Sequence, residues 1–176
     1  MTYQKPSLIL ASGNTLWNAW RRDYADVRAF EPDLHAVDLH QAQLQGIDFH
    51  EADLTEADIQ GADLRGADLR TADLRHANLR GANLSDAHLQ QAHLHGADLR
   101  DAKLCRANFL RADLSSADLR GADLSGANLE GANLNQAQSA EVDRSAQDRK
   151  VVDLDTPPAE EEERLAKALH HAATAA

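Results

Sequence analysis

Residues 62–81 read ADLRGADLRTADLRHANLRG, which is one five-residue unit repeated four times in an unbroken register. The unit is A-(D/N)-L-x-x. Its central leucine, or an Ile or Phe in its place, returns at every fifth position from Leu34 to Leu134. From Ala52 to Ala137 the residue two before each centre is always alanine, and the residue just before the centre is mostly Asp or Asn. A tandem repeat of this length decides the fold.

The period of five matches neither regular secondary structure. An α-helix repeats every 3.6 residues and a strand every 2, so a long helix would spread these leucines around its whole surface. The pattern instead predicts a chain that turns a corner every five residues, with the centre and the small alanine pointing inward and the other three positions outward. The sequence therefore predicts a solenoid.

Glycine supports the same geometry independently. Eight of the nine glycines lie two residues after a centre, where a type II turn needs its third residue at positive φ. They are Gly46, Gly61, Gly66, Gly81, Gly96, Gly121, Gly126 and Gly131. One position per repeat is thus expected to adopt a left-handed conformation.

The tandem A-(D/N)-L-x-x unit resembles the pentapeptide-repeat protein family over roughly residues 32–137. The resemblance implies an all-β fold, a right-handed quadrilateral parallel β-helix with four repeats per turn and about five coils here. Side chains would fill its interior completely and leave no internal cavity. The expected core ladder includes Leu34, Phe49, Leu54, Leu74, Leu94, Phe109, Leu114 and Leu134.

The chain divides into residues 1–31, a leader and cap; 32–137, the repeat body; and 138–176, a linker and C-terminal helix. The leader predicts a helix from Asn14 or Thr15 to about Tyr24, with Leu16, Trp17, Trp20 and Tyr24 on one side. A solenoid exposes the core of its first coil and needs a cover. Trp17 and Trp20 are expected to provide that cover, and a tryptophan-based binding site is the alternative.

The repeat pattern ends at Ser139, and a linker runs to Pro157-Pro158. Beyond it, residues Glu160–Ala176 predict a helix with acidic residues in its first turns and basic ones in its last, as the helix dipole favours. Three outcomes stay open for this segment. It docks on the last coil, forms a homodimer with a second copy, or stays a loose tail.

The composition limits the class of partner. The chain has 29 acidic and 18 basic side chains and a net charge of −11, which disfavours direct binding to nucleic acid or to an anionic membrane and favours a basic protein partner. Cys105 is the single cysteine and cannot form an internal disulfide. With no membrane span and no signal-peptide pattern, we expect a cytoplasmic location.

No catalytic or metal site is expected, and no cofactor. His88 and His93 belong to different sides of the predicted solenoid, whereas His76 and His95 lie on one side in successive coils. Two histidines do not supply the three or four ligands of a zinc site. A filled interior also leaves no pocket for a substrate. The sequence therefore predicts a non-enzymatic protein.

Sorting the outward residues by side gives the candidate contact surface. The side centred on Leu34, Leu54, Leu74, Leu94 and Leu114 has a net charge of −4, with Arg75 as its only Lys or Arg. Its acidic residues are Asp33, Asp53, Glu56, Asp73 and Asp113. Leu110, outward in a polar neighbourhood, is a second candidate contact. The sequence thus predicts a rigid scaffold for protein–protein contact, with a regulatory role as one option, although the aspartates can also serve local turn hydrogen bonds.

The alternative function is DNA mimicry. Some pentapeptide-repeat proteins resemble a DNA duplex and inhibit or protect DNA gyrase, which the resemblance makes a candidate target. A duplex about 25 Å long has roughly fifteen charges, but the four sides of this body sum to −8 and include a column of arginines. The body also has no inserted loops, so mimicry is the less favoured hypothesis.

Overall fold

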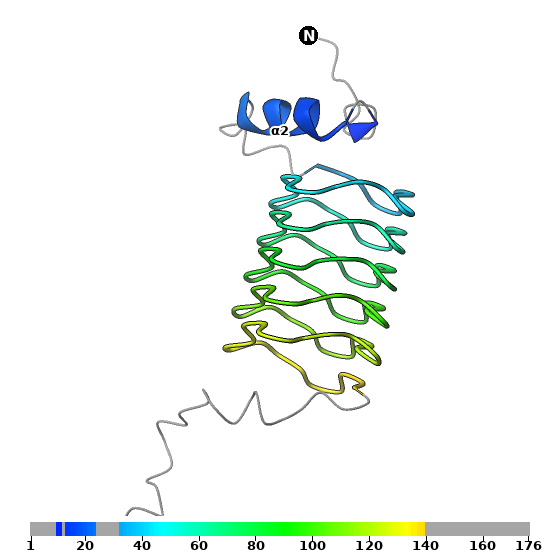
Figure 1. Ribbon diagram of the computed structural model, residues 1–176, viewed down its shortest axis with the longest axis vertical. Helices are drawn as coiled ribbons and strands as arrows, with labels where there is room; N and C mark the ends of the chain where they lie inside the picture. Colours follow the sequence, from blue (N-terminus) through cyan, green and yellow to red (C-terminus); the bar gives the residue numbers. More distant parts are fainter. Residues whose placement is uncertain (1–9, 12, 24–31, 140–176) are drawn as a thin grey trace, which may run out of the picture. The chain divides into compact units, whose positions relative to one another are not determined.

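The computed structural model describes residues 10, 11, 13–23 and 32–139. The C-terminal helix expected over Glu160–Ala176, its linker beyond Ser139 and the expected helix end at Tyr24 lie outside the described residues. Within them, one α-helix is formed over several turns, α2 (Asn14–Asp23). Residues 32–139 form stacked coils, which Figure 1 shows as successive turns of one ribbon.

The coils are joined by parallel bridges between residues twenty apart. The first bridge joins Asp33 to Asp53 and the last joins Asp118 to Gln138. Each coil therefore holds four repeats and has four sides, as predicted. In residues 32–139 every bridge is isolated, with one bridging residue per repeat and no longer strand, because the chain turns again before a second residue can pair.

The consensus unit is explained by a complete set of backbone hydrogen bonds. We name the positions A, D, L, x1 and x2 after the repeat Ala52-Asp53-Leu54-Thr55-Glu56. The A amide bonds to the L carbonyl three residues back, and the D amide bonds to the previous coil. The L and x2 amides bond to the next coil. The x1 amide bonds to the D side chain, so all five N–H groups have acceptors, as a packed fold requires.

The x2 position adopts positive φ in every repeat. The eight glycines there have φ between 62° and 75°, and the non-glycine residues at the same position have φ between 51° and 61°. Each turn closes with a bond from the A amide to the L carbonyl, such as the 3.1 Å bond from Ala57 to Leu54. The left-handed conformation predicted from the glycines is thus adopted at the x2 position of every described repeat, with or without glycine.

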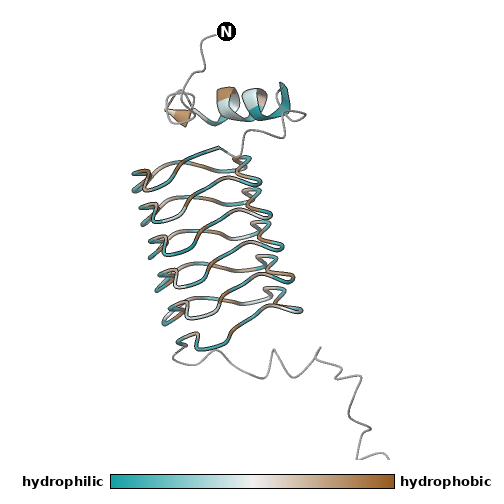
Figure 2. Ribbon diagram, turned by 180° about the vertical axis from the view of Figure 1, so that it is seen from behind, coloured by the Kyte–Doolittle hydropathy of each residue, from teal (hydrophilic) through white to brown (hydrophobic). Residues whose placement is uncertain are grey.

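The core consists of the L and A positions. From Leu54 to Phe109 every centre is fully buried, and the alanines beside them are at most 1% exposed. Figure 2 shows hydrophobic and hydrophilic segments alternating along each coil. Leu134 differs from the other members of the expected ladder because it is only half-buried. It lies in the last described coil, where no further described coil covers it.

Helix α2 covers part of the first coil through Trp17 and Trp20. Trp17 is fully buried, and its ring lies 5.5 Å from that of Phe49. Trp20 is half-buried and packs 5.3 Å from Trp17. Leu16, expected on the same side, is 58% exposed, because one residue along a helix rotates the side chain by about 100°. Within the described ranges, no helix is long and apolar enough to span a membrane.

Candidate interaction surface

The aspartates of the expected acidic side stabilise the turns in which they lie through local hydrogen bonds. In Asp33, Asp53 and Asp113 the Oδ1 atom accepts the amide of the residue two positions later, at 3.0–3.1 Å. Asparagines make the same bond elsewhere, for example Asn128 to the Glu130 amide at 3.1 Å. The turn hydrogen bond therefore uses one oxygen of each side chain. Whether a partner can bind the side chain depends on whether the second oxygen is already paired.

Arginines neutralise the aspartates of the middle coils. Arg75 donates from Nε and Nη2 to both carboxylate oxygens of Asp73, at 2.8 and 2.5 Å. Burial of the Asp73 carboxyl raises its pKa, but the bonds from Arg75 outweigh this effect and leave the pKa below its ordinary value. Asp73, named from the sequence as a contact residue, is thus already paired within the chain.

The same pairing recurs two residues apart along other sides. Bidentate pairs join Asp to Arg at Asp63–Arg65, Asp68–Arg70, Asp98–Arg100 and Asp118–Arg120. Arg106 forms a similar bidentate pair, at 2.7 Å, with Asp86 of the adjacent coil. The expected column of arginines, Arg80, Arg100 and Arg120, is therefore a ladder of ion pairs, and these arginines are not free anion-binding groups.

The stretch from Pro32 to Leu64, which is the first coil and about half of the second, is different because it has no arginine of its own. Between Pro32 and Leu64 the chain contains no lysine or arginine. Six carboxylates of this region have no Lys or Arg ion-pair partner among the described residues. Glu51 lies 3.4 Å from His50 Nε2, and we call the other five the acidic patch. They are Asp33, Asp38, Asp53, Glu56 and Asp58, which are exposed or half-exposed.

Bridges stack the patch aspartates in two columns. Asp33 pairs with Asp53 on one side, and Asp38 pairs with Asp58 on the next, so like charges lie one coil apart, about 4.8 Å. Sequence reasoning missed Asp38 and Asp58 because it summed charge by side over the whole body. The gap in Lys and Arg between Pro32 and Leu64 was the available signal.

The remaining candidates are less accessible than expected. Asp113 Oδ1 also accepts from Asn133 at 3.0 Å, and the hydrogen bond from Ser115 lowers its pKa. Leu110 is half-buried rather than freely projecting, because the stacking of coils places Gln90 and Glu130 directly before and after it in its column. Neither residue presents a free group comparable to the acidic patch.

Three side chains of types that often carry chemistry, His76, His95 and Cys105, lie elsewhere on the surface. The rings of His76 and His95 are 5.6 Å apart and nearly perpendicular. The thiol of Cys105 donates to Asp123 at 3.0 Å, and this bond raises the thiol's pKa, which disfavours the reactive thiolate. Across the part of the chain that the structure describes, no three His, Cys, Asp or Glu side chains converge as a metal site.

Comparison with known families identifies the chain. The family described as pentapeptide repeats matches residues 33–70, 72–109 and 97–136, with eight copies of the repeat. The chain is a pentapeptide-repeat protein. Members of this family are right-handed quadrilateral β-helices, which gives the handedness of the coils described above and confirms the predicted fold class.

Solved structures agree with this assignment. A pentapeptide-repeat protein from the cyanobacterium Cyanothece 51142 is 30% identical, with a TM-score of 0.61, over 70% of this chain and 94% of that one. One from the Arabidopsis thaliana thylakoid lumen is 29% identical, with a TM-score of 0.59, over 62% of this pentapeptide-repeat protein and 75% of that one. A search of curated proteins finds no match.

Proposed function

We propose that this pentapeptide-repeat protein is a non-enzymatic, rigid scaffold for protein–protein contact, and that the acidic patch binds a basic surface of its partner. The observation that carries the proposal is the uneven pairing of charge along the coils. Several carboxylates from Asp63 onward are neutralised by arginines two residues away, whereas the five carboxylates of the acidic patch have no such partner in the described residues.

Pre-organisation of the patch supports this function. The turn bond holds each patch aspartate through Oδ1, for example Asp38 to the His40 amide at 3.0 Å. The rotamers of these carboxylates are therefore already fixed before a partner binds. Binding then costs less side-chain entropy than it would with mobile acidic side chains. Such complementary charge mainly raises the association rate and the specificity, and the interaction weakens with salt.

The repeat itself offers a control for testing the patch. Because Asn makes the same turn bond as Asp, the change Asp→Asn removes charge and keeps the turn. The patch variant is Asp33→Asn, Asp38→Asn, Asp53→Asn and Asp58→Asn. The control variant removes equal charge from the last coils through Asp101→Asn, Asp113→Asn, Asp123→Asn and Glu130→Gln.

The experiment is affinity capture from extracts of the source cell, with the wild type and both variants at low and high salt. We expect the wild type and the control variant to capture the same basic partner, and the patch variant to lose it. High salt should release the partner from the wild type. Retention by the patch variant, or equal loss from both variants, would refute the role of the acidic patch.

DNA mimicry is the weaker candidate on this geometry. A duplex offers continuous negative charge on both strands, but the arginines of the ion-pair ladder interrupt the negative charge of the middle coils. We expect no inhibition of gyrase supercoiling at micromolar protein. Inhibition at that concentration would favour mimicry over the scaffold.

A further inference from the structure

The first coil has backbone groups that a preceding coil would normally bond. Within the body, the D carbonyl accepts from the L amide of the coil before, as Asp68 does from Phe49 at 2.8 Å. The D amide of Asp68 donates to the Ile47 carbonyl at 2.9 Å. The x1 carbonyl of Arg70 accepts from the Glu51 amide at 3.1 Å. One coil earlier, the equivalent groups belong to Asp48 and His50, and no described coil precedes them.

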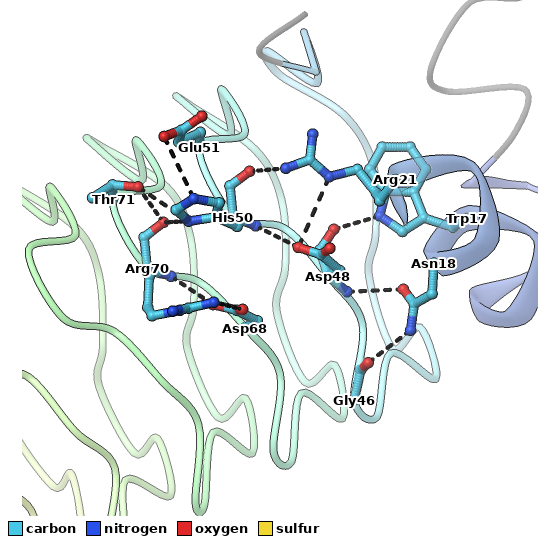
Figure 3. A network of polar contacts seen from close by, with 10 residues as sticks. All are labelled: Trp17, Asn18, Arg21, Gly46, Asp48, His50, Glu51, Asp68, Arg70 and Thr71. Atoms are coloured by element: carbon cyan, nitrogen blue, oxygen red, sulfur yellow. Dashed lines mark hydrogen bonds and ion pairs between the residues drawn. The ribbon is translucent and has the colours of Figure 1, made fainter. Parts of the chain in front are cut away.

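Side chains of α2 replace these missing bonds one for one. The Trp17 indole N–H donates to the Asp48 carbonyl at 2.6 Å. The Asp48 amide donates to Asn18 Oδ1 at 2.9 Å, and Arg21 Nη2 donates to the His50 carbonyl. Figure 3 shows these three contacts, with Asp68 and Arg70 of the next coil beside them. The helix therefore imitates the edge of a coil with side-chain donors and acceptors.

Further contacts complete this imitation. Asn14 Nδ2 donates to the Gln45 carbonyl at 3.2 Å, and Asn18 Nδ2 donates to the Gly46 carbonyl at 2.9 Å. Arg21 Nε also lies 3.8 Å from Asp48 Oδ1. The contacting residues are Asn14, Trp17, Asn18 and Arg21, which lie on one face of a helix at a spacing of i, i+3, i+4 and i+7.

The opposite end of the body presents the complementary groups. In the last coil the amides of Leu124, Leu129 and Leu134 have no acceptor among the described residues. Their side chains are half-buried, whereas those of Leu34 and Phe49 in the first coil are 2% and 0% exposed. Within the described part of the chain, this end therefore offers N–H groups without acceptors around an apolar centre. An unpaired edge of this kind is a template for pairing with another chain.

We propose that α2 is a terminator that prevents a second copy of this chain from stacking its last coil on the first coil. The D and x1 carbonyls of an uncovered first coil would accept the L and x2 amides of another molecule's last coil. Every junction inside the body uses this same pattern, so the added coil needs no new register. Head-to-tail contact thus pairs the amides of one molecule with the carbonyls of the next.

The test uses the full chain with the hydrogen-bonding face of α2 removed. The cap variant is Trp17→Ala, Asn18→Ala and Arg21→Ala, and alanine keeps the helix propensity high. The control variant changes the opposite face through Thr15→Ala, Leu16→Ala and Arg22→Ala, all of which are exposed. Molar mass is measured by light scattering over a wide range of protein concentration, with circular dichroism as a check on folding.

We expect the cap variant to form oligomers that grow with concentration and keep the wild-type β spectrum, while the control variant keeps the wild-type mass. Adding Leu129→Asp to the cap variant places a charge at the last described coil and should return the mass to the wild-type value. Wild-type protein has a covered first coil and can join a stack only through its last coil, so it should shorten the oligomers of the cap variant.

Two results would overturn the proposal. One is a folded cap variant that keeps the wild-type mass at every concentration, and the other is oligomers that Leu129→Asp leaves unchanged. Where the triple change unfolds the chain, Trp17→Phe is measured in its place, because it removes the indole donor and keeps an aromatic ring against Phe49. A weaker concentration dependence of the same kind is then expected, and its absence counts against the proposal.

Discussion

The indole N–H of Trp17 meets the carbonyl of Asp48 at 2.6 Å, in the place that the Phe49 amide takes on Asp68 one coil later. A helix side chain thus replaces a backbone amide as the donor. This relationship explains why the N-terminal cap is rich in polar side chains on its contact face, where a purely apolar cover would leave carbonyl groups without donors.

Replacing that one donor should be measurable. Trp17→Phe keeps a ring near Phe49 but leaves the Asp48 carbonyl without its hydrogen bond, so we expect the free energy of unfolding to fall by about 1–3 kcal/mol. Urea denaturation followed by circular dichroism gives this value. Leu16→Ala is the control and should change stability by no more than about 0.5 kcal/mol, as is usual for an exposed side chain. Equal losses from both changes would contradict the assigned role of Trp17.

The D position is expected to distinguish hydrogen bonding from charge. Asp53 Oδ1 accepts the Thr55 amide at 3.0 Å and the Thr55 hydroxyl at 2.5 Å. Asp53→Ala removes both acceptors and should cost about 1–2 kcal/mol, while Asp53→Asn keeps an acceptor and should cost much less. Thermal and urea unfolding compare the two. An Asn variant as unstable as the Ala variant would show that the carboxylate charge, not the turn bond, holds this position.

The x2 column predicts a difference between two glycines. Gly66 has φ +64°, and a Cβ added there would meet nothing within 4 Å, so Gly66→Ala should cost about 1 kcal/mol through backbone strain alone. At Gly96 a Cβ would lie 2.7 Å from His76 Nδ1, so Gly96→Ala should cost more. The double change His76→Ala with Gly96→Ala tests the cause by double-mutant cycle. The excess over Gly66→Ala should vanish in the double variant, and its persistence would rule out the clash with His76.

Acid should weaken the fold through the paired aspartates. The hydrogen bond from Arg65 lowers the pKa of Asp63 to about 2, below the roughly 3.9 of an unfolded aspartate. The resulting stability is present above about pH 4 and is lost as the pH falls towards 2. Carbon-13 NMR titration should therefore show the Asp63 pKa rising towards the ordinary value in Arg65→Met. Arg111→Met, which removes the same charge elsewhere, is the control, and an unchanged Asp63 pKa in Arg65→Met would exclude this pair as the cause.

Much of the fold could be predicted because the period constrains every repeat alike. A five-residue register forces the centres inward, and the glycines mark the one position of positive φ that Thr71 and Glu51 also adopt. The ion pairs between side chains could not be predicted in this way, because they depend on the rotamer that each side chain adopts. The position of Arg75 suggests an outward charge, and only the structure shows its guanidinium lying on Asp73 of the same repeat.

The N-terminal cap shows the same limit. The tryptophans of the leader indicate an apolar cover, and Trp17 provides one. The hydrogen bonds from Asn18 and Arg21 to the first coil depend on the rotation of α2 against that coil, which helix periodicity alone does not fix. The half-burial of Leu110 and Leu134 could not be predicted for a similar reason, since burial at these positions depends on which neighbours the adjacent coils provide.

The central functional claim is that the acidic patch is the contact surface. Its most direct test is the affinity of the captured partner for wild type, patch variant and control variant, measured by isothermal titration calorimetry at several salt concentrations. The account predicts that the patch variant binds at least about tenfold more weakly, a loss of about 1.4 kcal/mol, and that the control variant binds like the wild type. Equal affinity of the patch variant and the wild type would contradict it.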